Sequence, residues 1–262
     1  MNQSDNPFRP PEAEIEPVHH SDQGQLLADP RAVPAGHGID WISAAWQLFK
    51  ASPWLWIGML LVTFACFMVA SFLPLIGMFS SWLFPMFVGG WMIGCQRLTD
   101  SGELLFEDLF AGFSRHFKPL AIASLIYMGA TVVLTIVAMV LAGGIGFGAI
   151  MLSEADNTMT ITLAILLGVL LVMALSVPLL MMIWFAPALI VLNQVAPVDA
   201  LKMSFQGCLR NIMPFLVYGL VGMVILIVGM IPLFLGLLIV YPVLMCAVYT
   251  GYRDIFLEEG QA

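Results

Sequence analysis

Long apolar stretches alternate with short amphipathic segments along most of this chain. The first amphipathic segment begins at Trp41, has one apolar side, and ends at Lys50. From Pro53 the chain then runs without a charged residue for longer than the roughly 20 apolar residues that a helix needs to cross a bilayer. The same order of features returns at residues 106–127 and 199–218. This pattern predicts an all-α, polytopic membrane protein.

The apolar stretches predict six transmembrane helices arranged as three hairpins, each preceded by a cytoplasmic amphipathic helix. We expect the spans at residues 53–72, 76–95, 119–142, 161–193, 214–230 and 233–250. The fourth is longer than a bilayer needs and contains Pro178 and Pro187. It is therefore expected to tilt, to kink, or to emerge into the interface at one end. The third is expected to end at the glycine-rich residues 143–148.

The three amphipathic segments resemble one another. Each has aromatic side chains and a Lys or Arg within a few residues of a proline. We interpret them as an internal repeat, although interfacial aromatics and flanking cations are common in membrane proteins of every kind. The cations would reach the lipid headgroups with their long side chains. The residues that we predict to anchor the chain at the membrane interface are Trp41, Lys50, Trp54, Arg115, Lys118, Arg210, Tyr252 and Arg253.

Composition narrows the class of protein further. Hydrophobic residues make up 61% of the 262 residues and charged residues 10%, against about 25% charged in a soluble domain. No basic cluster is present that could neutralise phosphates, so nucleic acid is not an expected partner. With six spans, all nine Lys and Arg residues fall on one side of the membrane, which predicts that both termini are cytoplasmic.

The two ends of the chain are expected to lie outside the membrane domain, which covers residues 40–256. Residues 1–39 are acidic and rich in proline, with few apolar side chains to offset the entropy of ordering, so they predict a disordered cytoplasmic tail. Because they contain no apolar signal segment, we expect the first span to target the chain to the membrane. Residues 257–262 form a short C-terminal tail.

Candidate chemistry is sparse. No ionisable residue lies in the middle of a proposed span, which weighs against a proton-coupled pump or a transporter of charged substrates. The cysteines have no metal-ligand spacing and are interpreted as small core residues. We therefore predict no catalytic, cofactor-binding or metal site. The alternative of a lipid-modifying enzyme would use His116 with Glu107 and Asp108, although these two acids also suit a helix N-terminus.

Two further features leave alternatives open. Gly90 and Gly94 form a GxxxG spacing that serves packing within one chain or a dimer face equally well. Arg253 is an ordinary interface anchor, or it pairs with Glu107 or Asp108 and holds the C-terminus against the cytoplasmic helices.

Three stretches of the chain resemble a family of uncharacterised proteobacterial inner-membrane proteins. Gly38, Trp41 and Ile42 fit its opening pattern together with the Phe49-Lys50 hinge before Pro53. The middle stretch is RLTDSGELLFEDLFAGF, and the closing run is Tyr249, Tyr252, Arg253, Asp254, Ile255 and Phe256, with Gly251 where the family usually has serine. The resemblance covers residues 33–258. It implies a six-span protein of the bacterial inner membrane without an assigned activity, and it carries over no catalytic residue.

These observations leave three hypotheses for function. The first is a structural or assembly protein whose partners are membrane lipids, a second copy of the chain, or another membrane protein. The second is a channel or transporter for a neutral or apolar solute, with a path along helices broken by glycine and proline. The third is the lipid-modifying enzyme. A sealed apolar bundle favours the first hypothesis and a water-filled cavity favours the second.

Overall fold

The computed structural model describes residues 24–72, 74–152 and 158–258. Their regular secondary structure is helical apart from one isolated bridge between Leu26 and Leu257. The all-α prediction is therefore confirmed. The helices are α1 (His37–Ala51), α2 (Pro53–Ser71), α3 (Pro74–Ser101), the 3-10 helix η1 (Phe106–Phe110), α4 (Ala111–Ser114), α5 (Phe117–Leu152), α6 (Thr158–Trp184), α7 (Ala186–Asn193), α8 (Pro197–Arg210), α9 (Ile212–Met230) and α10 (Leu237–Phe256).

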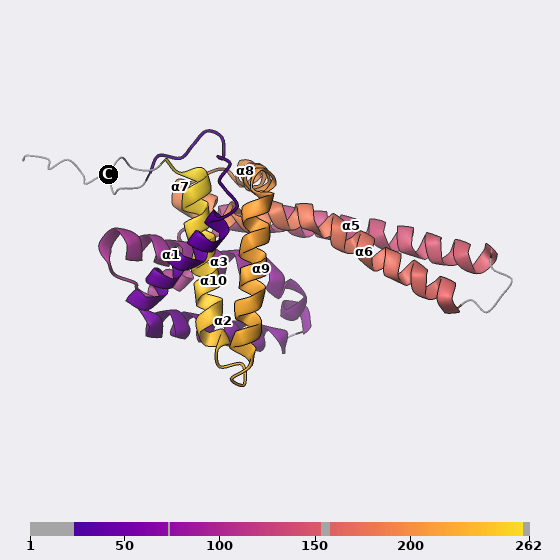
Figure 1. Ribbon diagram of the computed structural model, residues 1–262, viewed down its shortest axis with the longest axis horizontal. Helices are drawn as coiled ribbons and strands as arrows, with labels where there is room; N and C mark the ends of the chain where they lie inside the picture. The colour runs from indigo at the N-terminus through magenta and orange to yellow at the C-terminus, as the bar shows by residue number, and fades with distance from the viewer. Residues whose placement is uncertain (1–23, 73, 153–157, 259–262) are drawn as a thin grey trace, which may run out of the picture.

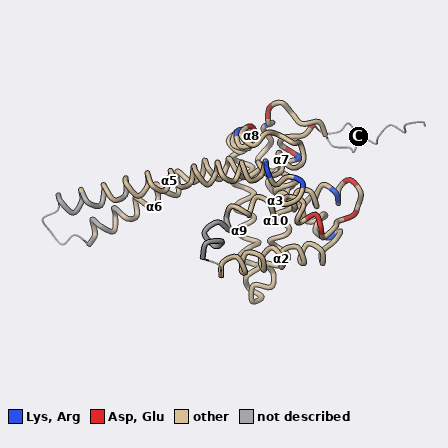
Figure 2. The backbone as a smooth tube through the Cα atoms, turned by 180° about the vertical axis from the view of Figure 1, so that it is seen from behind, with Lys and Arg blue, Asp and Glu red and all other residues tan. Residues whose placement is uncertain are grey.

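The helices form a body from which one pair projects. Helices α5 and α6 pack along each other and extend far beyond the body as a hairpin, while α9 and α10 run side by side within the body (Figure 1). In the described residues, the outer part of this hairpin carries no Lys, Arg, Asp or Glu, and the charged residues gather in the body (Figure 2).

Four helical stretches are long and apolar enough to cross a membrane. They are Pro53–Ser71, Phe117–Leu141, Ile165–Asn193 and Ile212–Met230. The other two predicted spans fall on α3 and α10, which are long but end in polar turns that contain Arg97 and Arg253, respectively. The structure thus gives an α-helical protein with four membrane-capable helices by length and composition.

The amphipathic segments are helical at each predicted place, as α1, as η1 with α4, and as α8. Each ends at a short break before an apolar helix. Ser52 leaves the helical conformation with φ −149° and ψ 60°, because the ring of Pro53 disfavours helical geometry in the preceding residue. Asn211 makes the corresponding break before α9, with φ −121° and ψ 35°.

The apolar sides of these helices face the protein. Trp41, Ala45 and Phe49 of α1 are buried, and α1 packs against α10 and α9. The buried residues Ala200 and Leu201 belong to α8, which packs against α6 and α7. Part of each apolar side therefore packs within the protein, and contact of the exposed faces with lipid stays a prediction. An apolar stripe of helical period has the same spacing whether lipid or another helix covers it.

The fourth predicted span divides at Phe185 into α6 and α7. The hydroxyl of Ser204 stabilises the division, since it accepts a hydrogen bond from the Phe185 amide at 2.9 Å and donates one to the Met181 carbonyl at 2.7 Å. Pro187 lies in the first turn of α7, whereas Pro178 lies inside α6 without ending it. Because α7 is buried from Ala186 to Val191, it forms the centre of the core, where it packs against α3 and α8.

Several helices have different bounds from the predicted spans. Helix α5 continues through the glycine-rich residues to Leu152, so the backbone at residues 143–148 is not unwound. Of the broken-helix positions that the transporter hypothesis offered, this leaves the prolines of the fourth predicted span. Helix α3 continues past residue 95 to Ser101, and α10 begins at Leu237 after a turn in which Leu233 and Phe234 have positive φ. The end of an apolar stretch marks the point where the surroundings of the side chains change from apolar to polar. The helix itself can continue past this point, because its backbone hydrogen bonds do not depend on those surroundings.

Gly90 serves packing within the chain. A Cβ added at Gly90 would collide with the backbone carbonyl of Leu109 in η1, and one at Gly112 of α4 would collide with that of Met86 in α3. A Cβ at Gly94 would lie 2.9 Å from the Leu104 side chain. These close approaches bring α3 against the second amphipathic segment.

We expect Gly90→Ala to lower the free energy of unfolding by about 1–3 kcal/mol, because the methyl group forces the two backbones apart. The control is Gly129→Ala in α5, where an added Cβ meets nothing within 4 Å and a helical alanine is favoured by about 0.5–1 kcal/mol. Thermal unfolding in a mild detergent measures both. Equal midpoints for the two variants would contradict the packing of α3 on η1.

Candidate functional site

Residues 24–36 form an ordered strap that joins the N-terminal part of the chain to the end of α10. The Leu27 amide donates to the Phe256 carbonyl at 2.8 Å, the Arg31 amide to the Ile255 carbonyl at 3.0 Å, and the Glu258 amide to the Gln25 carbonyl at 3.0 Å. The predicted disorder of residues 1–39 is therefore wrong for the strap, and also for residues 37–39, which begin α1. Residues 1–23 lie outside the described part of the chain.

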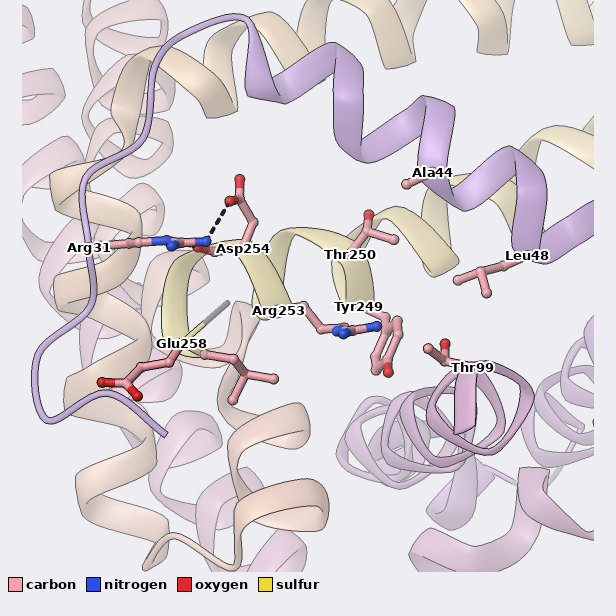
Figure 3. Close-up of a pocket in the computed structure, with 10 residues that line it drawn as sticks. Arg31, Ala44, Leu48, Thr99, Tyr249, Thr250, Arg253, Asp254 and Glu258 are labelled. Carbon is pink, nitrogen blue, oxygen red and sulfur yellow. Dashed lines mark hydrogen bonds and ion pairs between the residues drawn. The ribbon is translucent and has the colours of Figure 1, made fainter. Parts of the chain in front are cut away.

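The carboxylate of Asp254 fastens the strap and α1 to α10. Arg31 pairs with Oδ1 through Nη2 at 3.0 Å, and Figure 3 marks this contact. Oδ2 accepts a hydrogen bond from the Trp41 indole at 2.7 Å and lies 2.8 Å from His37 Nδ1, which donates to it. The Arg31 Nε–H also donates to the Asp254 carbonyl oxygen. We call these four residues the Asp254 clasp.

A second fastening lies at the break between α8 and α9. The buried amide of Asn211 accepts from the Val33 amide at 2.8 Å and donates to the Arg31 carbonyl at 2.9 Å and to the Gly207 carbonyl at 2.8 Å. Arg210 donates to the Pro30 carbonyl at 2.7 Å. Asn211, which follows the last residue of α8, therefore also holds the strap.

The predicted interface anchors occupy two kinds of place. Trp41 and Tyr252 are buried, and Tyr252 donates its hydroxyl to the Asn193 side chain, so both belong to packing and hydrogen bonding inside the protein. Arg253 is half-buried. The exposed anchors are Lys50, Trp54, Arg115, Lys118 and Arg210, whose role at a membrane interface stays a prediction.

The acids expected to pair with Arg253 do not do so. Asp108 is buried and pairs with Arg97 of α3 at 2.9 Å, and it also accepts from the Leu105 amide. In the described part of the chain, neither Glu107 nor Asp108 shares an ion pair with Arg253. The guanidinium of Arg253 instead lies over the ring of Tyr249, 6.0 Å from its centroid.

A polar pocket of about 460 Å³ opens beside the Asp254 clasp. Its walls come from the strap, α1, α3 and the last two turns of α10 (Figure 3). The residues that line it are Arg31, Ala44, Leu48, Thr99, Tyr249, Thr250, Arg253, Asp254, Leu257 and Glu258. The Thr99 and Thr250 hydroxyls donate to the backbone carbonyls of Cys95 and Trp41, so Arg253 supplies most of the unused donors in the pocket.

An apolar groove of about 580 Å³ lies where α2, α3, α5, α6, α7 and α10 meet. Its lining residues are Phe67, Phe84, Pro85, Val88, Tyr127, Leu180, Ile183, Trp184, Pro187, Met245 and Val248. The volume suits a small hydrophobic ligand or part of a lipid chain. The break between α6 and α7 contributes to the groove through Trp184 and Pro187.

The other candidate chemistry is not brought together. Among the described residues, His116 shares no hydrogen bond or ion pair with Glu107 or Asp108. Burial, and after it the neighbouring Arg115 cation, lower the pKa of His116. Cys95, Cys208 and Cys246 are buried as predicted for core residues, and the sulfur atoms of Cys95 and Cys246 lie 3.6 Å apart. The prediction is wrong for Cys66, which is exposed.

Sequence reasoning missed the strap, the clasp and the groove. The partners of Asp254 lie 213 to 223 residues away from it, and no local pattern connects them. The one usable signal is the position of Arg31, a lone cation just before the first amphipathic helix.

We expect Asp254→Asn to destabilise the protein by about 2 kcal/mol, because it removes the negative charge that accepts from Arg31, His37 and Trp41. Trypsin should then cleave after Arg31 faster than in the wild type. The control is Asp199→Asn, which removes an exposed pair with Lys202 at 3.8 Å and should change stability by less than about 1 kcal/mol. Unchanged cleavage after Arg31 in Asp254→Asn would refute the clasp.

The chain is similar to a protein of Burkholderia thailandensis that is named a probable inner membrane protein. The two are 27% identical over 250 residues, which cover 86% of this chain and 92% of that protein. No protein-family model matches the chain, and no solved structure does. The four membrane-capable helices and this similarity agree that the chain is a helical protein of the membrane.

Proposed function

We propose that this chain is a multi-pass protein of the bacterial inner membrane that acts as a structural or assembly factor and holds a lipid acyl chain in its apolar groove. The groove is the observation that carries the proposal. Its lining is apolar except for the Tyr127 hydroxyl and the indole nitrogen of Trp184, and three of the helices that form it, α2, α5 and α6, contain membrane-capable stretches.

The surroundings of the groove suit a lipid chain. The apolar side chains of α5 and α6 are exposed beside it, for example Leu180 at 47% and Val177 at 51%. In a bilayer such surfaces contact acyl chains, and a groove open to them takes up a chain without exposing it to water. Phe67 and Trp184 give this groove broad aromatic walls.

The proposed topology has six spans and cytoplasmic termini. Helices α3 and α10 supply the two spans beyond the four membrane-capable stretches, with 28 and 20 residues respectively, enough to cross about 30 Å of hydrocarbon. The turn between α9 and α10 carries no charge, while Arg210 and Arg253 lie at the opposite ends of these helices. Cations kept on one side support this orientation.

A channel or transporter for a neutral or apolar solute is the second candidate. The break at Phe185 favours it, because a discontinuous helix beside a groove offers backbone groups to a solute. We propose no catalytic role.

Filling the groove should remove its lipid. We expect the wild-type protein, purified in a mild detergent, to retain about one phospholipid more per chain than Val248→Trp, whose indole would occupy the groove. The control is Val133→Trp, which places the same side chain on the exposed face of α5. Native mass spectrometry counts the retained lipids. Equal retention by all three proteins would contradict the proposal, and a small neutral solute retained instead would favour transport.

Labelling of single cysteines tests the topology. In a Cys66→Ala background, whose other cysteines are buried, we expect Ile231→Cys in the α9–α10 turn to react with a membrane-impermeant maleimide on intact spheroplasts. Lys202→Cys in α8 should react only after lysis, since α8 lies on the proposed cytoplasmic side. Reaction of both cysteines on intact spheroplasts would refute the six-span arrangement.

A further inference from the structure

We propose that the polar pocket beside the Asp254 clasp binds an oxyanion, a phosphate or carboxylate group, on the guanidinium of Arg253. This proposal is independent of the lipid chain proposed for the apolar groove.

Two other polar side chains in the closing run of α10 have hydrogen-bond partners inside the protein. Tyr252 donates to Asn193, and Asp254 is held by the clasp. Ile255 and Phe256 are fully buried in the core. Within the described part of the chain, the guanidinium of Arg253 has no hydrogen bond and no ion pair. It lies over the Tyr249 ring, and Asp100 lines a small neighbouring cavity with it. The fold therefore leaves this group available to a ligand.

Arg253 differs from the other cations in its surroundings. Four of them form ion pairs with acids: Arg31, Arg97, Lys202 and Arg210. Three more, Lys50, Arg115 and Lys118, are exposed. Arg253 is half-buried and lines a pocket of about 460 Å³. Such a pocket can hold a small headgroup or metabolite against the cation.

The guanidinium is oriented before any ligand arrives. Tyr249 lies one helical turn before Arg253 on α10, so its buried ring supports the planar group from one side. In Figure 3 the Arg253 guanidinium points along Tyr249 toward Thr99 of α3, away from the Glu258 carboxylate. A planar fork of free N–H donors matches the two oxygens of a phosphate or carboxylate.

The positive and negative charges that line the pocket nearly cancel, so the pocket as a whole attracts an anion only weakly. Arg31 and Asp254 neutralise each other at 3.0 Å. Glu258 also lines the pocket but is exposed and lies on the other side of it. Recognition therefore depends on the bidentate fork of Arg253 more than on a general positive field. Lysine at this position would keep the charge and lose the fork.

The oxyanion can come from two sources, the phosphate of an anionic lipid headgroup or a free ion. The test uses the full chain in a neutral, phosphate-free detergent and measures its thermal unfolding. One arm adds inorganic phosphate against chloride at constant ionic strength, which removes general screening effects. The other adds phosphatidylglycerol, with diacylglycerol as its uncharged counterpart.

We expect the unfolding midpoint of the wild type to rise with phosphatidylglycerol, with inorganic phosphate, or with both, and not with diacylglycerol or chloride. A rise with the lipid alone identifies a headgroup site, and a rise with both identifies a site for free oxyanions. Arg253→Gln should weaken the apparent affinity at least about tenfold. Lys202→Gln, which removes an exposed cation outside the pocket, should respond like the wild type.

Two results would overturn the proposal. One is a wild type whose midpoint does not respond to either phosphate source. The other is a response of equal size in Arg253→Gln. Should Arg253→Gln not fold, Arg253→Lys replaces it, and an affinity equal to that of the wild type would then exclude the bidentate site.

Discussion

A half-buried carboxylate must be neutralised or hydrogen-bonded, and the arrangement of this protein depends on how Asp254 meets that requirement. Its donors are Arg31, His37 and Trp41, which belong to the strap and to the first turns of α1. Satisfying one charge on α10 therefore places α1 across α10 and α9, with Trp41 buried between them. The apolar side of α1 is covered for the same reason.

The sequence predicted the helices well and their partners poorly. Pro53 marks the start of α2 because proline is tolerated in a first turn and restricts the residue before it. The amphipathic period of α1 predicts which residues share a face, but it contains no information about what covers that face. The sequence alone predicts Trp41 and Tyr252 at the membrane interface, whereas tertiary packing and hydrogen bonding place them inside the protein.

The strap could not be predicted for a different reason. It is held by backbone groups of residues 25–31 and 255–258, and backbone hydrogen bonds are indifferent to side-chain type. The strap has the composition of a disordered tail. It is ordered because distant residues such as Asn211 form hydrogen bonds with it. The polar pocket could not be predicted for the same reason, because its walls come from elements far apart in the sequence.

The groove and the pocket share one wall. Met245 and Val248 of α10 line the apolar groove, while Tyr249 and Arg253 line the polar pocket, so two neighbouring stripes of the same helix serve two different environments. Helix α10 is held at its end by the clasp and along its length by α1, α9, α2 and α3. A rigid helix cannot move one stripe without the other. A ligand that moved α10 as a rigid body at the pocket would therefore also move the wall of the groove.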